Sequence, residues 1–196
     1  MISGQFAQPR GLLGRLVGRT MARRNAVLTR RVVAALTLRG DETVVEFGPG
    51  PGVGLRLLAE ALPGGRVIGV EPSPVMRTQA AARTRQFADR VELIDGTADA
   101  VTLPAGSIDA VCAVNNVQLW QPLPASLARV CQLLRSGGTV AFGITEHAVL
   151  PDGGSAGRDF DTYLLPYLTR AGFTDLVAVW SPGGNGEELL VEGRLP

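Results

Sequence analysis

The feature that most constrains the fold is a regular exchange between two hydrophobic patterns after residue 41. Short apolar runs rich in Val and Ile alternate with longer segments whose apolar residues recur at helical spacing. The expected strands are Thr43–Phe47, Arg66–Val70, Val91–Ile94, Ile108–Val114 and Thr139–Ile144, and the expected helices are Leu55–Leu62, Pro74–Ala88 and Leu123–Leu134. Near-continuous apolar strands between helices are typical of a parallel sheet covered on both faces. We therefore predict a doubly wound α/β fold.

Near the C-terminus the pattern changes. Leu176–Trp180 and Leu189–Glu192 flank the Gly-rich sequence SPGGNGEE and predict an antiparallel hairpin at a sheet edge, which gives about seven strands in all. No linker is long enough to divide the chain. We expect one domain over residues 1–196, with a helical extension over 1–40 and the sheet core over 41–196.

The N-terminal extension and the core carry opposite charges. Residues 1–40 contain eight Arg and no acidic residue, whereas residues 41–196 contain 11 Arg and 18 acidic residues. Apolar residues recur at helical spacing from Leu12 to Leu38, and we expect two short helices with a break near Asn25, which is suited to an N-cap. The basic residues form either a solvated helix face or a contact with an anionic partner.

Composition excludes several classes. The formal net charge of +1 argues against a nucleic-acid partner. Two cysteines are too few for a disulfide framework and indicate a reducing compartment. The N-terminus lacks the apolar core of a signal peptide, and no apolar run approaches the roughly 18 residues that a membrane span requires. These features predict a soluble, cytoplasmic domain, and we expect no metal site.

Glycines at alternate positions follow the first expected strand and lead into a helix: Gly48, Gly50, Gly52 and Gly54. Without a Cβ, such a loop can turn sharply and approach a ligand, and the helix behind it presents free N–H groups. Ligands of open α/β sheets bind at this carboxyl edge. The segment therefore predicts a ligand-binding loop, with a tight turn that holds no ligand as the alternative.

Two carboxylates indicate which ligand the loop would hold. The glycine spacing does not match the G-x-G-x-x-G fingerprint of dinucleotides, and Glu46, just before the loop, would repel a pyrophosphate but suit a cationic group. Glu71 directly follows the second expected strand, where a carboxylate can accept hydrogen bonds from ribose hydroxyls; a solvated loop charge is the alternative. A ribose and an ammonium without phosphate describe S-adenosylmethionine (SAM).

These residues resemble the class I SAM-dependent methyltransferases, particularly small bacterial members near the ubiquinone/menaquinone and phosphatidylethanolamine methyltransferase groups. Glu46-x-Gly48-x-Gly50-x-Gly52 matches the first motif of that family, and Glu71 matches the acidic end of its second strand. The resemblance runs from about Asp41 to Ile144. It implies a Rossmann-like fold, a SAM cofactor and methyl transfer.

The resemblance also implies roles for individual residues. Glu46 and the backbone from Gly48 to Gly52 would hold the methionine part of SAM, Glu71 would bind the ribose, and Pro72 and Met76 would lie beside the adenine. The segment Asp95-Gly96-Thr97-Ala98 resembles the family's adenine-reading Gly-Asp-Ala, with Thr97 in the place of the usual Asp and the Ala98 N–H as a further donor. The backbone of Asn115 would face the methionine end.

The acceptor site is expected at the carboxyl edge of the sheet, where the glycine loop also lies. His147, the only His, follows the fifth expected strand and is the candidate general base for an acceptor that arrives protonated; an exposed loop His is the alternative. Gln118 and Trp120 follow the fourth strand and are candidate pocket residues. Tyr163 and Tyr167 are expected in the core.

For the N-terminal helices two interpretations stay open. As a lid, they would bring Met21 or Asn25 to the substrate. As an interfacial basic helix, residues 10–31 would make a peripheral contact with anionic lipid.

We expect a SAM-dependent methyltransferase for a small-molecule acceptor. A lipid or quinone methyltransferase at the membrane surface, and a SAM-binding protein without methyl transfer, are the alternatives. The acceptor atom and the oligomeric state stay open.

Overall fold

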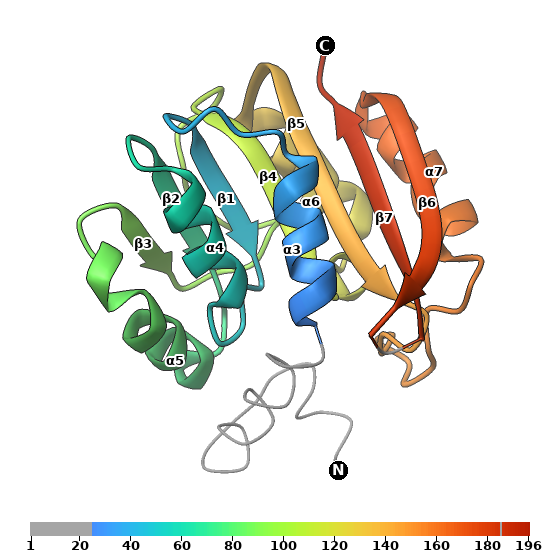
Figure 1. Ribbon diagram of the computed structural model, residues 1–196. Helices are drawn as coiled ribbons and strands as arrows, with labels where there is room; N and C mark the ends of the chain where they lie inside the picture. The colour runs from blue at the N-terminus through green and yellow to red at the C-terminus, as the bar shows by residue number, and fades with distance from the viewer. Residues whose placement is uncertain (1–24, 185) are drawn as a thin grey trace.

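The computed structural model describes residues 25–184 and 186–196, which form a mixed seven-stranded sheet between two layers of helices (Figure 1). The strands are β1 (Thr43–Phe47), β2 (Arg66–Val70), β3 (Val91–Ile94), β4 (Ile108–Val114), β5 (Leu134–Thr145), β6 (Thr174–Gly183) and β7 (Gly186–Arg194). The helices are α3 (Ala26–Ala35), α4 (Val53–Ala61), α5 (Pro74–Thr84), α6 (Leu123–Leu133) and α7 (Phe160–Ala171), with short 3-10 turns at Arg85–Phe87 and Val117–Leu119.

The strand order is β3-β2-β1-β4-β5-β7-β6. The first five strands in this order run parallel, and β7 pairs antiparallel with both β5 and β6. This confirms the predicted doubly wound, mostly parallel sheet with a C-terminal antiparallel hairpin. The chain reverses its direction of winding between β1 and β4, and ligands of open α/β sheets bind at such a switch point, beyond the carboxyl ends of the strands.

Alternate side chains of each central strand enter the two cores. In β1, Val44 packs into the cluster formed with α3 and α4, whereas Val45 and Phe47 pack into the cluster formed with α6 and α7. The same alternation holds for Cys112 and Val111 in β4. Both faces of the sheet are therefore apolar, as predicted from the near-continuous apolar runs.

Helix α3 is fixed to the sheet by a buried ion pair. The Arg31 guanidinium lies 3.2 Å from the carboxylate of Glu188 in β7, whose side chain is fully buried, and it also contacts the Ser181 hydroxyl. Arg31 is thus turned toward the protein, whereas Arg30 is exposed. Helix α3 begins after Asn25, where the second N-terminal helix was predicted to begin, but the Asn25 side chain does not cap α3; instead its carbonyl accepts hydrogen bonds from the Thr29 N–H and hydroxyl.

Strand β5 begins at Leu134, directly after α6, and therefore starts earlier than the expected Thr139; its first part pairs irregularly with β4. The first expected N-terminal helix and Met21 lie outside the described residues. None of the described helices is long and apolar enough to cross a membrane.

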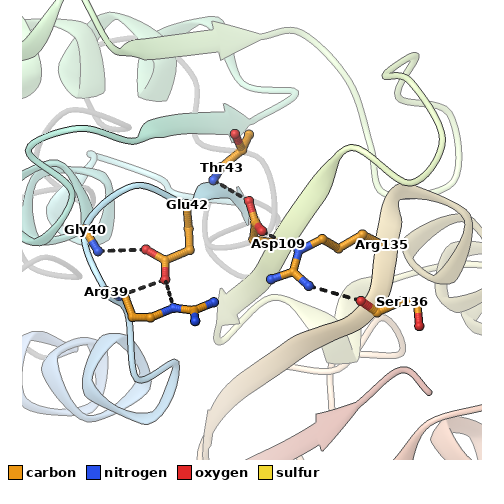
Figure 2. Close-up of polar contacts among 7 residues, drawn as sticks. All are labelled: Arg39, Gly40, Glu42, Thr43, Asp109, Arg135 and Ser136. Carbon is orange, nitrogen blue, oxygen red and sulfur yellow. Dashed lines mark hydrogen bonds and ion pairs between the residues drawn. The ribbon is translucent and has the colours of Figure 1, made fainter.

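Polar contacts tie the strands together at the amino edge of the sheet, opposite the switch-point crevice (Figure 2). The Asp109 carboxylate, at the start of β4, accepts hydrogen bonds from the Thr43 N–H of β1 at 2.8 Å and from the Arg135 guanidinium of β5. The Glu42 carboxylate accepts from the backbone N–H groups of Arg39 and Gly40 and so shapes the turn into β1. Asp109 is therefore a structural residue that joins three strands.

Replacing Asp109 by Asn should lower the free energy of unfolding by about 1–2 kcal/mol, because the neutral amide cannot accept from both donors as strongly as a carboxylate does. Thermal or denaturant unfolding of Asp109→Asn measures this. Asp89→Asn is the control, since Asp89 is 72% exposed beside Arg90 and should change stability by less than about 0.5 kcal/mol. Equal effects of the two substitutions would contradict the structural role of Asp109.

Candidate cofactor and acceptor site

The glycine loop crosses the carboxyl end of β1 in left-handed backbone conformations. Gly48, Gly50 and Gly52 have φ values of +64°, +52° and +80°, and Gly52 precedes the first turn of α4. At Gly54 the requirement is space: a Cβ there would lie 2.1 Å from Oε1 of Glu46. The loop sequence therefore lets the Glu46 carboxylate lie beneath the start of α4.

Glu46 is buried at the switch point with its hydrogen bonding incomplete. The side chain is 3% exposed, and its Oε2 has no hydrogen-bond partner among the described residues. Burial, together with the nearby charge of Glu71, raises the pKa of Glu46 to about 8, although the Leu55 N–H opposes this by bonding to the carboxylate. A cation or an N–H donor placed beside Oε2 would restore the ionised form.

Glu71 is held in a fixed orientation at the end of β2. Its two carboxylate oxygens accept hydrogen bonds from the Gly50 N–H at 3.0 Å and the Ser73 N–H at 2.9 Å. Burial raises the pKa of Glu71, while these N–H donors and the Arg77 charge oppose the rise. The carboxylate thus joins the glycine loop to the start of α5 and leaves further lone pairs for a ligand.

A cavity of about 350 Å³ extends from the glycine loop across the ends of β2, β3 and β4. Among its lining residues are the predicted Gly48, Pro72, Thr97 and Ala98. Its volume is in the range of small-molecule sites. Glu71 and Met76, also predicted to contact this ligand, are both buried and are not among the residues that line the cavity.

Asp99 and Asn116 are among the wall residues that were not predicted. Asp99 lies two residues beyond Thr97, accepts a hydrogen bond from the Thr97 hydroxyl at 2.7 Å, and lines the cavity. It could have been predicted from the sequence, because it is an acidic residue close to the position of the family's usual Asp. Asn116 lies against Gly48 and accepts from the Trp120 indole N–H at 2.6 Å. Its neighbour Asn115, with φ +48°, turns its side chain to the Thr145 N–H.

Asn25 lies in a different part of the site from the one expected for a substrate contact. Together with Thr29 it lines a small hollow of about 40 Å³ whose other walls include Glu46, Gly50 and Gly54. The start of α3 therefore adjoins the buried carboxylate.

A second cavity, of about 450 Å³, adjoins the first. Trp120, Gln121 and Pro151 line both cavities, and Gln118 lines the second. Tyr163, expected in the core, is 50% exposed and lies in the wall of this second cavity. Tyr167 is partly buried and packs against the core, as predicted.

His147 follows β5 at the carboxyl edge, as predicted, with its Nε2 3.4 Å from the Glu146 carboxylate. Its side chain is 64% exposed and borders the β6–β7 turn near Gly186. Within the described part of the chain, His147 lines neither of the two large cavities.

The raised pKa of Glu46 predicts a pH-dependent stability. Between the ordinary value of 4.5 and about 8, the folded state keeps a proton that the unfolded state releases, so stability falls as the pH rises through this window. Glu46→Gln removes the titrating group. At pH 9 it should be more stable than the wild type by about 1–3 kcal/mol, the cost of an uncompensated buried polar group, and this difference should shrink toward pH 5.

Unfolding curves at several pH values measure this difference, with Glu60→Gln as the control because Glu60 is an exposed carboxylate. A Glu46→Gln difference that stays constant with pH would show that Glu46 does not retain a proton in the folded state.

Comparison with known proteins agrees with this geometry. Residues 44–138 match the family described as "Methyltransferase domain". The chain is 26% identical over 163 residues to the uncharacterized methyltransferase YdaC of Bacillus subtilis (strain 168), which covers 82% of this chain and 87% of that protein. It is 36% identical over 114 residues to a trans-aconitate 2-methyltransferase of Azoarcus sp. (strain BH72), which covers 58% of this chain and 43% of that protein.

A solved SAM-dependent methyltransferase from Aquifex aeolicus has the same fold, with a TM-score of 0.72 at 16% identity over 89% of this chain and 93% of that chain. Apart from YdaC, the curated relatives are matched over less than half of their own length. One assignment follows from the glycine loop with its two carboxylates, the strand order and these similarities. Residues 44–138 belong to the methyltransferase domain family, and the chain has the fold of the class I SAM-dependent methyltransferases.

Proposed function

We propose that the chain transfers a methyl group from SAM to a small organic acceptor, with SAM in the 350 Å³ cavity and the acceptor in the adjoining 450 Å³ cavity. The observation that carries this proposal is the buried Glu46 carboxylate beside the glycine loop, whose Oε2 has no partner among the described residues. A buried acceptor without a donor is costly, and the ammonium of a SAM methionine moiety would satisfy it.

The remaining cofactor contacts are proposed residue by residue. Glu71 accepts hydrogen bonds from the ribose hydroxyls, because its carboxylate is already oriented by Gly50 and Ser73. Thr97, Ala98 and Asp99 face the adenine, since all three line the far end of the cavity. The backbone at Gly48, Gly50, Gly52 and Asn115 borders the methionine end.

SAM supplies an electrophilic methyl group on a sulfonium. What the protein contributes to such an in-line substitution is alignment of the acceptor with that methyl group and exclusion of water. Trp120 is suited to this role because it lines both cavities. It is fixed by edge contacts with Phe47 and Phe142 and by its hydrogen bond to Asn116.

For His147 we propose the role of general base toward an acceptor that arrives protonated. Because the imidazole lies outside the two cavity walls, this role requires the segment around residues 146–148 to move toward the acceptor.

A small acceptor fits the charge distribution better than a lipid surface does. Arg31, within the segment expected to contact anionic lipid, is paired with the buried Glu188 and turned into the protein. Among the relatives are proteins named for nocamycin and trans-aconitate methylation, which are small-molecule acceptors.

Titration of the purified protein with SAM tests the cofactor assignment, and one site per chain is expected. Glu71→Gln should weaken SAM binding by about 10- to 100-fold, since charge-assisted hydrogen bonds contribute about 1.5–3 kcal/mol. Glu92→Gln, an exposed carboxylate on the neighbouring strand, should bind SAM as the wild type does. Unchanged affinity in a folded Glu71→Gln variant would overturn the ribose assignment.

A further inference from the structure

The 450 Å³ cavity has a composition that restricts the acceptor it can hold. It lies between the 3-10 turn Val117–Leu119, the start of α6, the loop before α7 and the first turn of α7. Its inner wall is apolar and includes the buried side chains of Trp120, Leu123 and Phe160. Such a wall favours an acceptor with an aromatic or branched apolar body.

The two charged residues of the cavity wall are both acidic. Asp152 and Asp159 both line the cavity and are exposed, and no cationic side chain is among the described residues of the wall. Arg158, next to Asp159, is directed instead toward Glu187, with 3.8 Å between Nη2 and Oε2. An anionic acceptor would meet two like charges there without a counter-ion.

The first turn of α7 does not reverse this preference. A helix N-terminus attracts anions, but Asp159 and Asp161 already supply negative charge at this end of α7. The ring of Tyr163 extends the aromatic wall toward the entrance and packs at 5.5 Å from the ring of Phe160. Aromatic faces next to carboxylates are the surroundings that organic cations prefer.

Gln118 provides an independent indication of a ligand. Its side chain is 8% exposed and lines the cavity, and its Oε1 has no hydrogen-bond partner in the described structure. Buried polar atoms are nearly always paired, so this oxygen calls for a donor. A ligand N–H would supply it.

We propose that this cavity binds an organic amine with an aromatic or branched apolar body, and that the amine nitrogen is the methyl acceptor. The inference rests on the proposed function. Asp152 and Asp159 attract the ammonium form at the entrance, the apolar wall holds the body, and Gln118 Oε1 accepts an N–H hydrogen bond that orients the nitrogen.

The chemistry of such a transfer balances without a further reactant. The ammonium first loses its proton, directly or through water at the open entrance, to the proposed base His147, because only the neutral amine has a free lone pair. That lone pair forms the new N–C bond while the C–S bond breaks and its electron pair stays on sulfur. The methylated product is an ammonium, which the two carboxylates also stabilise.

The test compares two ligands of similar size and opposite charge, 2-phenylethylamine and 3-phenylpropionate. Each is titrated into the full chain saturated with S-adenosylhomocysteine, with ligand-observed NMR detecting millimolar binding. We expect the amine to bind at least about five times more tightly than the carboxylate. In Asp152→Asn/Asp159→Asn its affinity should fall by about three- to tenfold, as for exposed charge pairs.

Two variants serve as controls. Asp175→Asn removes an exposed carboxylate at the opposite edge of the sheet and should leave amine binding unchanged. Gln118→Leu should weaken amine binding while S-adenosylhomocysteine affinity stays that of the wild type, which separates this inference from the cofactor assignment.

Tighter binding of the carboxylate, or no binding of either ligand to a chain that binds S-adenosylhomocysteine, would overturn the amine assignment and leave the cofactor site intact. Failure of S-adenosylhomocysteine itself to bind would refute the proposed function instead.

Discussion

The buried carboxylate of Glu46 is the constraint around which the rest of the site is arranged. A carboxylate removed from water is stable only if it is protonated or if it has donors and a counter-charge. Here the Leu55 N–H supplies one donor, the neighbouring Glu71 adds repulsion, and Oε2 has no partner among the described residues. The sheet places this group at the switch point between β1 and β4, where a ligand can complete it.

The residues around the Glu46 carboxylate are arranged to make room for it and to hold its neighbours in place. Gly54 lacks a side chain because one would collide with the carboxylate, and Glu71 is oriented by the same loop through Gly50. The start of α3 lies close by, and the Arg31–Glu188 ion pair fixes this helix to β7. In the opposite cluster, Trp120 packs against Phe47 and Phe142 and lines both cavities.

Local sequence patterns were sufficient to predict the sheet and the glycine loop. The strand positions of β1 to β4 follow from apolar runs of Val and Ile, and the loop follows from glycines at alternate positions, because both signals lie within a few residues. The 450 Å³ cavity could be predicted in this way only at Gln118 and Trp120, which follow β4. It forms where the ends of β4 and β5 meet the first turn of α7, so Gln121, Phe160 and Tyr163 come together only through long-range packing. The exposure of Tyr163 and the early start of β5 at Leu134 could not be predicted for the same reason, because tertiary contacts determine both.

The most direct test of the account is to count the protons exchanged when SAM binds. Titrations at pH 7 in buffers of different ionisation enthalpy give this number for the wild type and for Glu46→Gln. SAM carries the same titrating groups in both titrations, so the difference in proton number between the two proteins belongs to Glu46. With a pKa of about 8, Glu46 is mostly protonated in the free protein at pH 7. The account predicts that the wild type releases up to about one proton more than Glu46→Gln. Equal proton release in the two proteins, or a wild type that does not bind SAM, would contradict it.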